Sequence, residues 1–170
     1  MVSLFKEVFM LDALIHTIKI TRDSTLKLVA DLSDDQLALQ PAPKMNHPAW
    51  VLGHLLLVDG NFLTLAGGIA PTLEPNWKDI YGGGSTPVAD KSKYKPKQWY
   101  LDQMASVRNQ IVERLKVLTP EDMAKPHPDP ARRERFPTVG HTMFIYGTWH
   151  EAYHAGQISA WRRVLGLPAV

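Results

Sequence analysis

The sequence contains no cysteine, which excludes disulfide scaffolds, thiolate zinc sites and cysteine nucleophiles. It also lacks an excess of either charge, because 19 basic side chains face 17 acidic ones and the net charge is +2 with the histidines neutral. Such a balance argues against a nucleic-acid-binding protein, which would neutralise phosphates with a basic surface. Neither an internal repeat nor the alternation of β-branched residues that is typical of sheets is evident.

Long apolar runs are scarce as well. The apolar stretches fall far short of the roughly 20 residues that span a bilayer. The N-terminal segment, MVSLFKEVFMLDALIH, lacks a basic start and mixes charged side chains with its apolar ones. It is therefore predicted to be neither a signal peptide nor an anchor. We expect a cytoplasmic protein that does not bind membranes.

What the sequence does contain is the composition of an ordinary globular domain, with 170 residues of which 45% are hydrophobic and 21% charged. This length predicts one domain over residues 1–170. A chain of this size buries roughly 70% of its unfolded surface, so neither disulfides nor metal are needed for folding.

Apolar residues recur at intervals of three and four in four segments, which predicts four amphipathic helices and an all-α bundle. The first helix is expected over residues 4–32, and the second from an Asn46 cap to Gly67. The third is expected over residues 97–118, and the last from a Thr138 cap to Gly166. Residues 67–96 predict a long loop that acts as a crossover or lid, and residues 126–137 a linker rich in proline and charge.

Three of the seven histidines share the inward faces of two predicted helices. His150 and His154 are four residues apart, so both project from one face of the last helix. His54 lies on the apolar stripe of the second helix, between Trp50 and Val58. Buried imidazoles need polar partners, and a divalent metal would satisfy all three together. The alternative is that each one is a hydrogen-bonded core histidine.

The other histidines have less informative surroundings. His47 and His127 are expected to be exposed, and His16 and His141 are not expected to bind metal. The string HEAYH at residues 150–154 matches the H-E-x-x-H pattern of zinc proteases, in which Glu151 would be the general base. No histidine or acidic residue follows it as a third ligand. We therefore expect Glu151 to support the site or face solvent rather than to act as a base.

Two motifs resemble those of the DinB-like proteins. Residues 50–55, WVLGHL, are similar to the W-x-x-G-H-L start of their second helix, and residues 150–158, HEAYHAGQI, to their H-x-x-x-H-x-G-Q signature. The joint LSDDQL at residues 32–37 is similar too, and the likeness extends over essentially the whole chain. It implies a four-helix bundle whose second and third helices are parallel and joined by a long crossover. It also implies a divalent metal site at His54, His150 and His154.

Two classes of function stay open. Three histidines without a carboxylate leave a coordination position open, as in catalytic zinc sites. The resemblance implies a divalent ion such as Zn, Ni, Mn or Fe that activates a low-molecular-weight thiol or water towards a small-molecule substrate, in an S-transferase or hydrolase. The alternative is a non-catalytic metal- or ligand-binding protein. Gln157, one turn beyond His154, is the candidate catalytic residue that orients a water or a substrate carbonyl, unless it only serves a core hydrogen-bond network.

The remaining candidates have simpler interpretations. Asp12 and His16 are expected on a solvated face rather than bonded to a ligand imidazole. Arg162 and Arg163 are expected to complement the dipole of the last helix rather than to attract an anionic substrate. Two loop aromatics either line a pocket mouth or pack the loop onto the bundle; they are Trp77 and Tyr81. The family resemblance predicts a homodimer. Aromatic residues that the bundle alone would not cover also favour a dimer; they are Phe5, Phe9 and Trp99.

Overall fold

The computed structural model describes the backbone of residues 2–170 and the side chains of residues 9–170. Four long helical segments form a bundle, and no strand occurs in the described chain, which confirms the all-α prediction. The long segments are α1 (Val2–Ala30), α3 (Pro48–Leu65), α5 (Lys97–Leu115) and a last helix made of α7 (Val139–Phe144), the π-helical η3 (Ile145–His150) and α8 (Glu151–Val164). The short elements are α2 (Asp34–Leu37), α4 (Trp77–Tyr81), η1 (Lys91–Lys93), α6 (Pro120–Ala124) and η2 (Pro130–Arg132).

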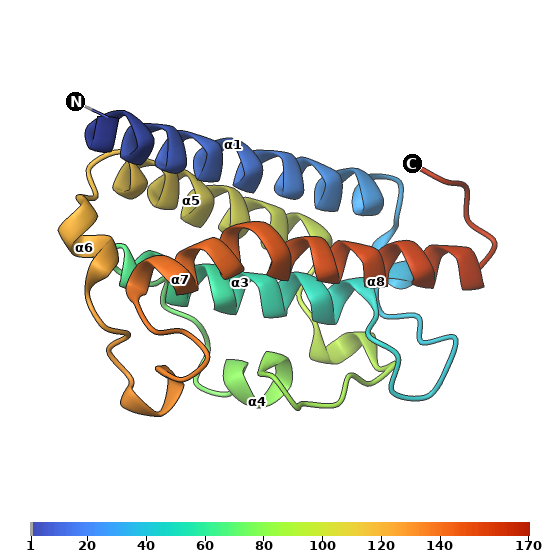
Figure 1. Cartoon of the computed structure of the whole chain (residues 1–170). Coiled ribbons are helices and arrows are strands. Elements are labelled where there is room, and N and C mark those ends of the chain that lie inside the picture. Colours follow the sequence, from blue (N-terminus) through green and yellow to red (C-terminus); the bar gives the residue numbers. More distant parts are fainter. Residues whose placement is uncertain (1) are drawn as a thin grey trace.

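The bundle has the expected parallel pair. Figure 1 shows α3 and α5 running in one direction, and α1 and the last helix in the opposite one. The ends of α3 and α5 meet where Arg114 Nε donates a hydrogen bond to the carbonyl oxygen of Ala66 at 2.9 Å. At the other end of the bundle, Lys97 Nζ donates to the carbonyl oxygen of Ala30 at 3.0 Å. The crossover between α3 and α5 is therefore confirmed.

Every long helix contributes fully buried side chains to one core, among them Ile18, Leu55, Ile111 and Trp161. The helix α3 lies in the centre, and 78% of its 18 residues are buried. By length and composition alone this helix is apolar enough to cross a membrane. Its burial is what the central helix of a bundle requires.

Helix ends differ from the predicted ones by a few residues. The first helix ends at Ala30 and the third at Leu115, each earlier than expected. The N-cap of α3 is His47 and not Asn46, because the Nδ1 atom of His47 accepts a hydrogen bond from the backbone N–H of Trp50. Thr138 caps the last helix, as predicted. Gly166 follows its end with φ 67°, a left-handed conformation that suits glycine.

The last helix contains the π-helical segment η3, which the periodicity did not predict. A π turn inserts an extra residue and rotates the rest of the helix about its axis, and such turns are frequent at functional sites. Here η3 ends at His150. Its Gly147 packs tightly on α1, since a Cβ atom added there would lie 2.6 Å from Ile18 Cγ2.

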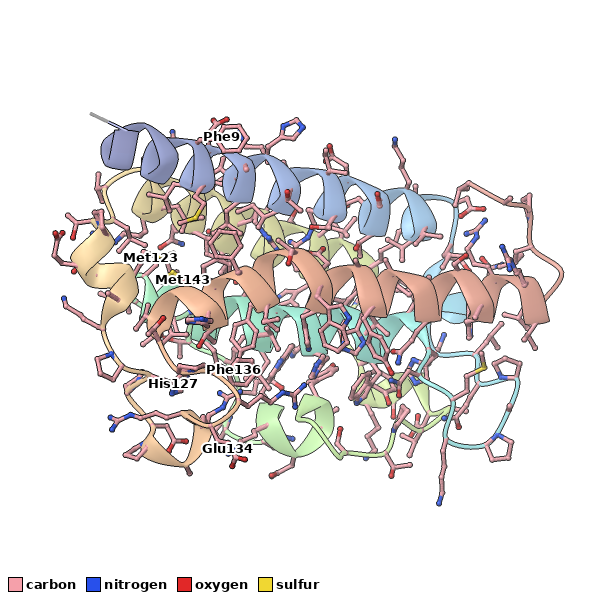
Figure 2. All side chains as sticks on the ribbon, in the orientation of Figure 1. Phe9, Met123, His127, Glu134, Phe136 and Met143 are labelled. Atoms are coloured by element: carbon pink, nitrogen blue, oxygen red, sulfur yellow. The ribbon has the colours of Figure 1, made fainter. Side chains whose placement is uncertain are left out.

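The two predicted loops are ordered. In residues 67–96, the short helix α4 lies on the bundle with Trp77 and Tyr81 buried, so these aromatics pack the loop down. Residues 126–137 are closed at their base by two hydrogen bonds, His127 N–H to Pro137 O and Val139 N–H to Lys125 O. His127 and Phe136 are buried within this segment (Figure 2). The expectation of an exposed His127 in a linker was therefore wrong.

Candidate metal centre

Three histidines from two helices meet beneath α4. His54 comes from the middle of α3, His150 from the end of η3, and His154 from the first turns of α8. One ring nitrogen of each lies within 4.8 Å of the other two, and His54 Nε2 is 3.3 Å from His150 Nε2. Two nitrogens bound tetrahedrally to one zinc ion would be about 3.4 Å apart. The predicted convergence is confirmed, and the donor set suits a divalent metal.

The surrounding residues hold two of the rings in place. The Nδ1–H group of His54 donates to the backbone carbonyl oxygen of Tyr81 at 2.6 Å, and Trp50 stacks on the same ring with centroids 4.8 Å apart. His154 Nδ1–H donates to Gln157 Oε1 at 2.9 Å. Such bonds on the outer nitrogen leave Nε2 for the metal and orient the ring. The Nδ1 atom of His150 is buried without a partner among the described residues.

Burial keeps the three imidazoles neutral. It lowers the pKa of His54. It lowers the pKa of His150 to about 3, with His154 and His54 adding to the effect. For His154, burial and the neighbouring His54 lower the pKa to about 4. Neutral imidazole is the form that binds metal, so at neutral pH the site needs to release no proton.

A cavity of about 910 Å³ opens beside the three histidines. It lies between α3, α4, the last helix and the segment 126–137, and all three histidines and Gln157 line it. No aspartate or glutamate is among its described lining residues. A metal held here would therefore keep its positive charge and face a space that can admit a small molecule.

Comparison with known families adds to this geometry. A model of the DinB superfamily matches residues 17–158. The chain belongs to the DinB superfamily. The residues matched to the DinB superfamily include His54, His150, His154 and Gln157. A search of curated proteins finds no match.

The other histidines are placed elsewhere. His47 was expected to be exposed but is fully buried. Both of its ring nitrogens have partners there: Nδ1 accepts from the Trp50 N–H and Nε2 donates to the Val88 carbonyl oxygen. His16 and Asp12 are both exposed on α1, as predicted for a solvated face. His141 is exposed on α7. None of these belongs to the metal cluster.

Glu151 follows His150 directly but faces away from the cavity. It is 1% exposed, so the surface alternative for this residue was wrong. Arg22 Nε donates to Glu151 Oε1 at 2.7 Å, and Arg108 Nη2 to Glu151 Oε2 at 2.6 Å. Burial raises the pKa of a carboxyl, but here the two guanidinium groups outweigh it and hold the pKa of Glu151 below its usual range. These contacts argue against a protease-type general base.

Arg162 also differs from expectation. Its side chain is buried and pairs with both carboxylate oxygens of Asp31, at 2.6 and 2.9 Å. This pair connects α8 to the end of α1, so complementing a helix dipole is not its main role. Arg163 is exposed in the last turn of α8, as expected.

Part of the site could not be predicted from the sequence. The carbonyl oxygen of Tyr81 orients His54, but a backbone group carries no signal in the sequence. Arg132 and Arg135 line the cavity from the segment 126–137, whose proline and charge content was typical of a linker. The aromatic Phe136, which follows Arg135 directly, was a sign in the sequence that this segment packs on the bundle.

Proposed function

We propose that this protein is a metal-dependent enzyme in which His54, His150 and His154 hold a divalent ion, Zn, Ni, Mn or Fe, that activates a thiol or water towards a small molecule. The reaction would be of the S-transferase or hydrolase type. One observation carries the proposal: three neutral imidazoles converge at the wall of a cavity of about 910 Å³ whose described lining has no carboxylate. Imidazole ligands suit Zn, Ni and Fe best, whereas Mn more often takes oxygen ligands.

The residues around the three histidines would have distinct tasks. When bound, the metal would act as a Lewis acid and lower the pKa of a nucleophile. Tyr81 O and Trp50 hold the ring of His54. Gln157 Oε1 accepts hydrogen bonds from both His154 Nδ1 and Asn46 Nδ2. The Gln157 amide N–H groups are therefore free to face the cavity. We propose that Gln157 is a catalytic residue whose N–H groups bind a substrate carbonyl or a water.

Metal analysis of the purified protein tests the site. We expect about one divalent ion per chain, and His150→Ala should lose it because two imidazoles bind far more weakly than three. His16→Ala is the matched control, since His16 is exposed and outside the cluster. With Co²⁺ in place, adding a small thiol should change the absorption spectrum. Metal retained by the His150→Ala variant would refute the ligand set, and a cobalt spectrum that no thiol or water exchange alters would indicate a closed, non-catalytic site.

A cytoplasmic homodimer stays part of the proposal. Of the three aromatic residues that favour a dimer, Phe9 is 67% exposed on the outer side of α1 (Figure 2). Trp99 is only partly exposed, because it packs on Trp77 with ring centroids 5.3 Å apart. The side chain of Phe5 lies outside the described residues. Light scattering at high micromolar concentration should give twice the chain mass, and a monomer would refute the dimer.

A further inference from the structure

One wall of the cavity is positively charged. Lys78 from α4 and two arginines from the segment 126–137, Arg132 and Arg135, are among its lining residues. Across the part of the chain with described side chains, none of the three forms an ion pair. The lining contains no carboxylate that would compensate them. An anionic ligand could therefore pair with these three side chains.

The two arginines are held in place by aromatic rings. Arg132 Nη2 donates to the hydroxyl oxygen of Tyr146 at 2.8 Å, and its guanidinium lies 5.1 Å from the ring centroid of Phe136. The guanidinium of Arg135 lies 5.3 Å from the same ring. Phe136 itself is buried. Guanidinium groups stacked on a fixed ring lose less conformational freedom when they bind a ligand.

The acidic residue between these arginines does not compensate them. Figure 2 shows Glu134 at the outer edge of the molecule, and it is exposed and absent from the cavity lining. The segment keeps this shape through its own hydrogen bonds. Arg133 Nε donates to the carbonyl oxygen of His127 at 2.7 Å. The backbone N–H of Phe136 donates to the carbonyl oxygen of Arg132 at 2.8 Å. The backbone thus directs Arg132 and Arg135 to the cavity and Glu134 to solvent.

The arginines are also close to the metal centre. The ring of Tyr146, which binds Arg132, is 5.9 Å from the ring of His150 between centroids. Arg132 and Arg135 line the same cavity as the three histidines. A molecule of a few heavy atoms can therefore reach from the guanidinium groups to the three histidines.

We propose that the cavity binds a small organic anion, whose carboxylate or phosphate group is held by Arg132 and Arg135 while its reacting part faces His54, His150 and His154. This rests on the proposed function and narrows its substrate class. The planar guanidinium fork fits carboxylate and phosphate oxygens. A neutral ligand that displaced water from this wall would leave the guanidinium groups unpaired, at a cost in binding free energy.

The first experiment uses metal-free protein, so that it does not depend on the metal. Tryptophan fluorescence reports binding, since Trp50 and Trp149 line the cavity. Succinate and inorganic phosphate are titrated separately, which distinguishes the two kinds of anionic group, and dimethyl succinate is the uncharged control. We expect a saturable change with at least one anion and none with the ester. Equal responses to anion and ester, or no response to either anion, would overturn the inference.

Matched variants locate the anion. Arg132→Gln and Arg135→Gln should each weaken anion binding by about tenfold or more, because a charge-assisted pair is lost. Arg163→Gln removes the same charge from the exposed end of α8 and should leave the affinity within about twofold. If Arg132→Gln fails to fold, Arg135→Gln carries the test, since Arg135 is exposed and its replacement leaves Phe136 in place. Unchanged anion affinity in the folded arginine variants would overturn the inference.

The second experiment separates this inference from the proposed function. Protein loaded with Co²⁺ is titrated with 3-mercaptopropionate and with its methyl ester, which share a thiol and differ in charge. We expect the acid to bind about tenfold more tightly, a difference that Arg135→Gln removes. Equal binding of both thiols would overturn the anion site and leave the metal function standing. If the protein bound anions but took up no Co²⁺, the metal function would be overturned and the anion site would stand.

Discussion

At the scale of single residues, the glycine before His54 has a steric explanation. A Cβ atom on Gly53 would lie 2.2 Å from Cε1 of the Tyr81 ring, far inside van der Waals contact. The carbonyl oxygen of the same Tyr81 accepts the hydrogen bond from His54. The missing side chain therefore lets α4 approach α3 closely enough for the backbone carbonyl of Tyr81 to orient His54.

We expect Gly53→Ala to displace Tyr81 and thereby weaken the metal site. Overpacking of this kind costs about 1–3 kcal/mol of unfolding free energy, and loss of a bond that orients a ligand histidine typically lowers metal affinity by about 10- to 100-fold. Urea denaturation and a competition assay with a zinc indicator measure the two effects. Gly156→Ala is the control, because nothing lies within 4 Å of a Cβ atom added there. It should be neutral or stabilising, by up to about 1 kcal/mol. Wild-type metal affinity in Gly53→Ala would show that Tyr81 does not orient His54.

The cluster of three histidines was predictable at this scale because its signal lies in side chains. His150 and His154 are four residues apart on one helical face, and His54 lies on an apolar stripe. His47 was misjudged because a histidine that caps a helix through its ring is indistinguishable in sequence from a solvated one. Partners on the backbone, such as Tyr81 O, leave no trace in residue type.

At the scale of helices, each of the four long segments contributes one charged side chain to a buried cluster. Its members are Arg22 of α1, Asp59 of α3, Arg108 of α5 and Glu151 of α8. Each arginine bonds to both acids, and the N–O distances of the four ion pairs are 2.6, 2.7, 2.9 and 2.6 Å. The net charge of the cluster is zero. It thereby couples the registers of the helices that carry His54 and His150.

Removing one acid should destabilise the bundle. Asp59→Asn leaves two buried arginines against one carboxylate, and breaking a buried ion pair in this way costs about 3–5 kcal/mol. Asp23→Asn is the control, since Asp23 is exposed on α1. It should change the stability by less than about 0.5 kcal/mol. Guanidinium denaturation followed by circular dichroism measures both variants. A loss below about 1 kcal/mol in Asp59→Asn would mean that the cluster contributes little to stability.

Helix positions were predicted within a few residues because apolar periodicity extends over each helix. The charged cluster was not, since its members lie far apart in the chain and single charges on a helix normally face solvent. The π turn was missed for a related reason. It coincides with the close contact of Gly147 with Ile18 of α1, which is a tertiary interaction and not a local pattern.

At the scale of the whole molecule, the core and the three histidines occupy different regions. Fully buried side chains from all four long helices make one core, among them Ile18, Leu55, Ile111 and Trp161. The three histidines lie at the edge of that core, on the wall of the cavity. Domains of this size bury enough apolar surface to fold without metal. A metal that binds the folded chain alone therefore adds stability only through mass action.

Chelation is accordingly expected to empty the site and leave the bundle folded. Protein treated with EDTA should keep its helical circular dichroism and unfold in one cooperative transition. Adding back zinc at about 100 times its dissociation constant should raise the unfolding free energy by about 2.7 kcal/mol. The His150→Ala variant should lie within about 1–3 kcal/mol of the metal-free wild type, the cost of unpairing one buried polar group, and zinc should no longer raise its melting temperature. If EDTA alone abolished the helical signal, the metal would be a structural element that closes the bundle. A catalytic role would then lose its physical basis, because structural metal sites are usually fully coordinated by side chains and leave no open position for a substrate.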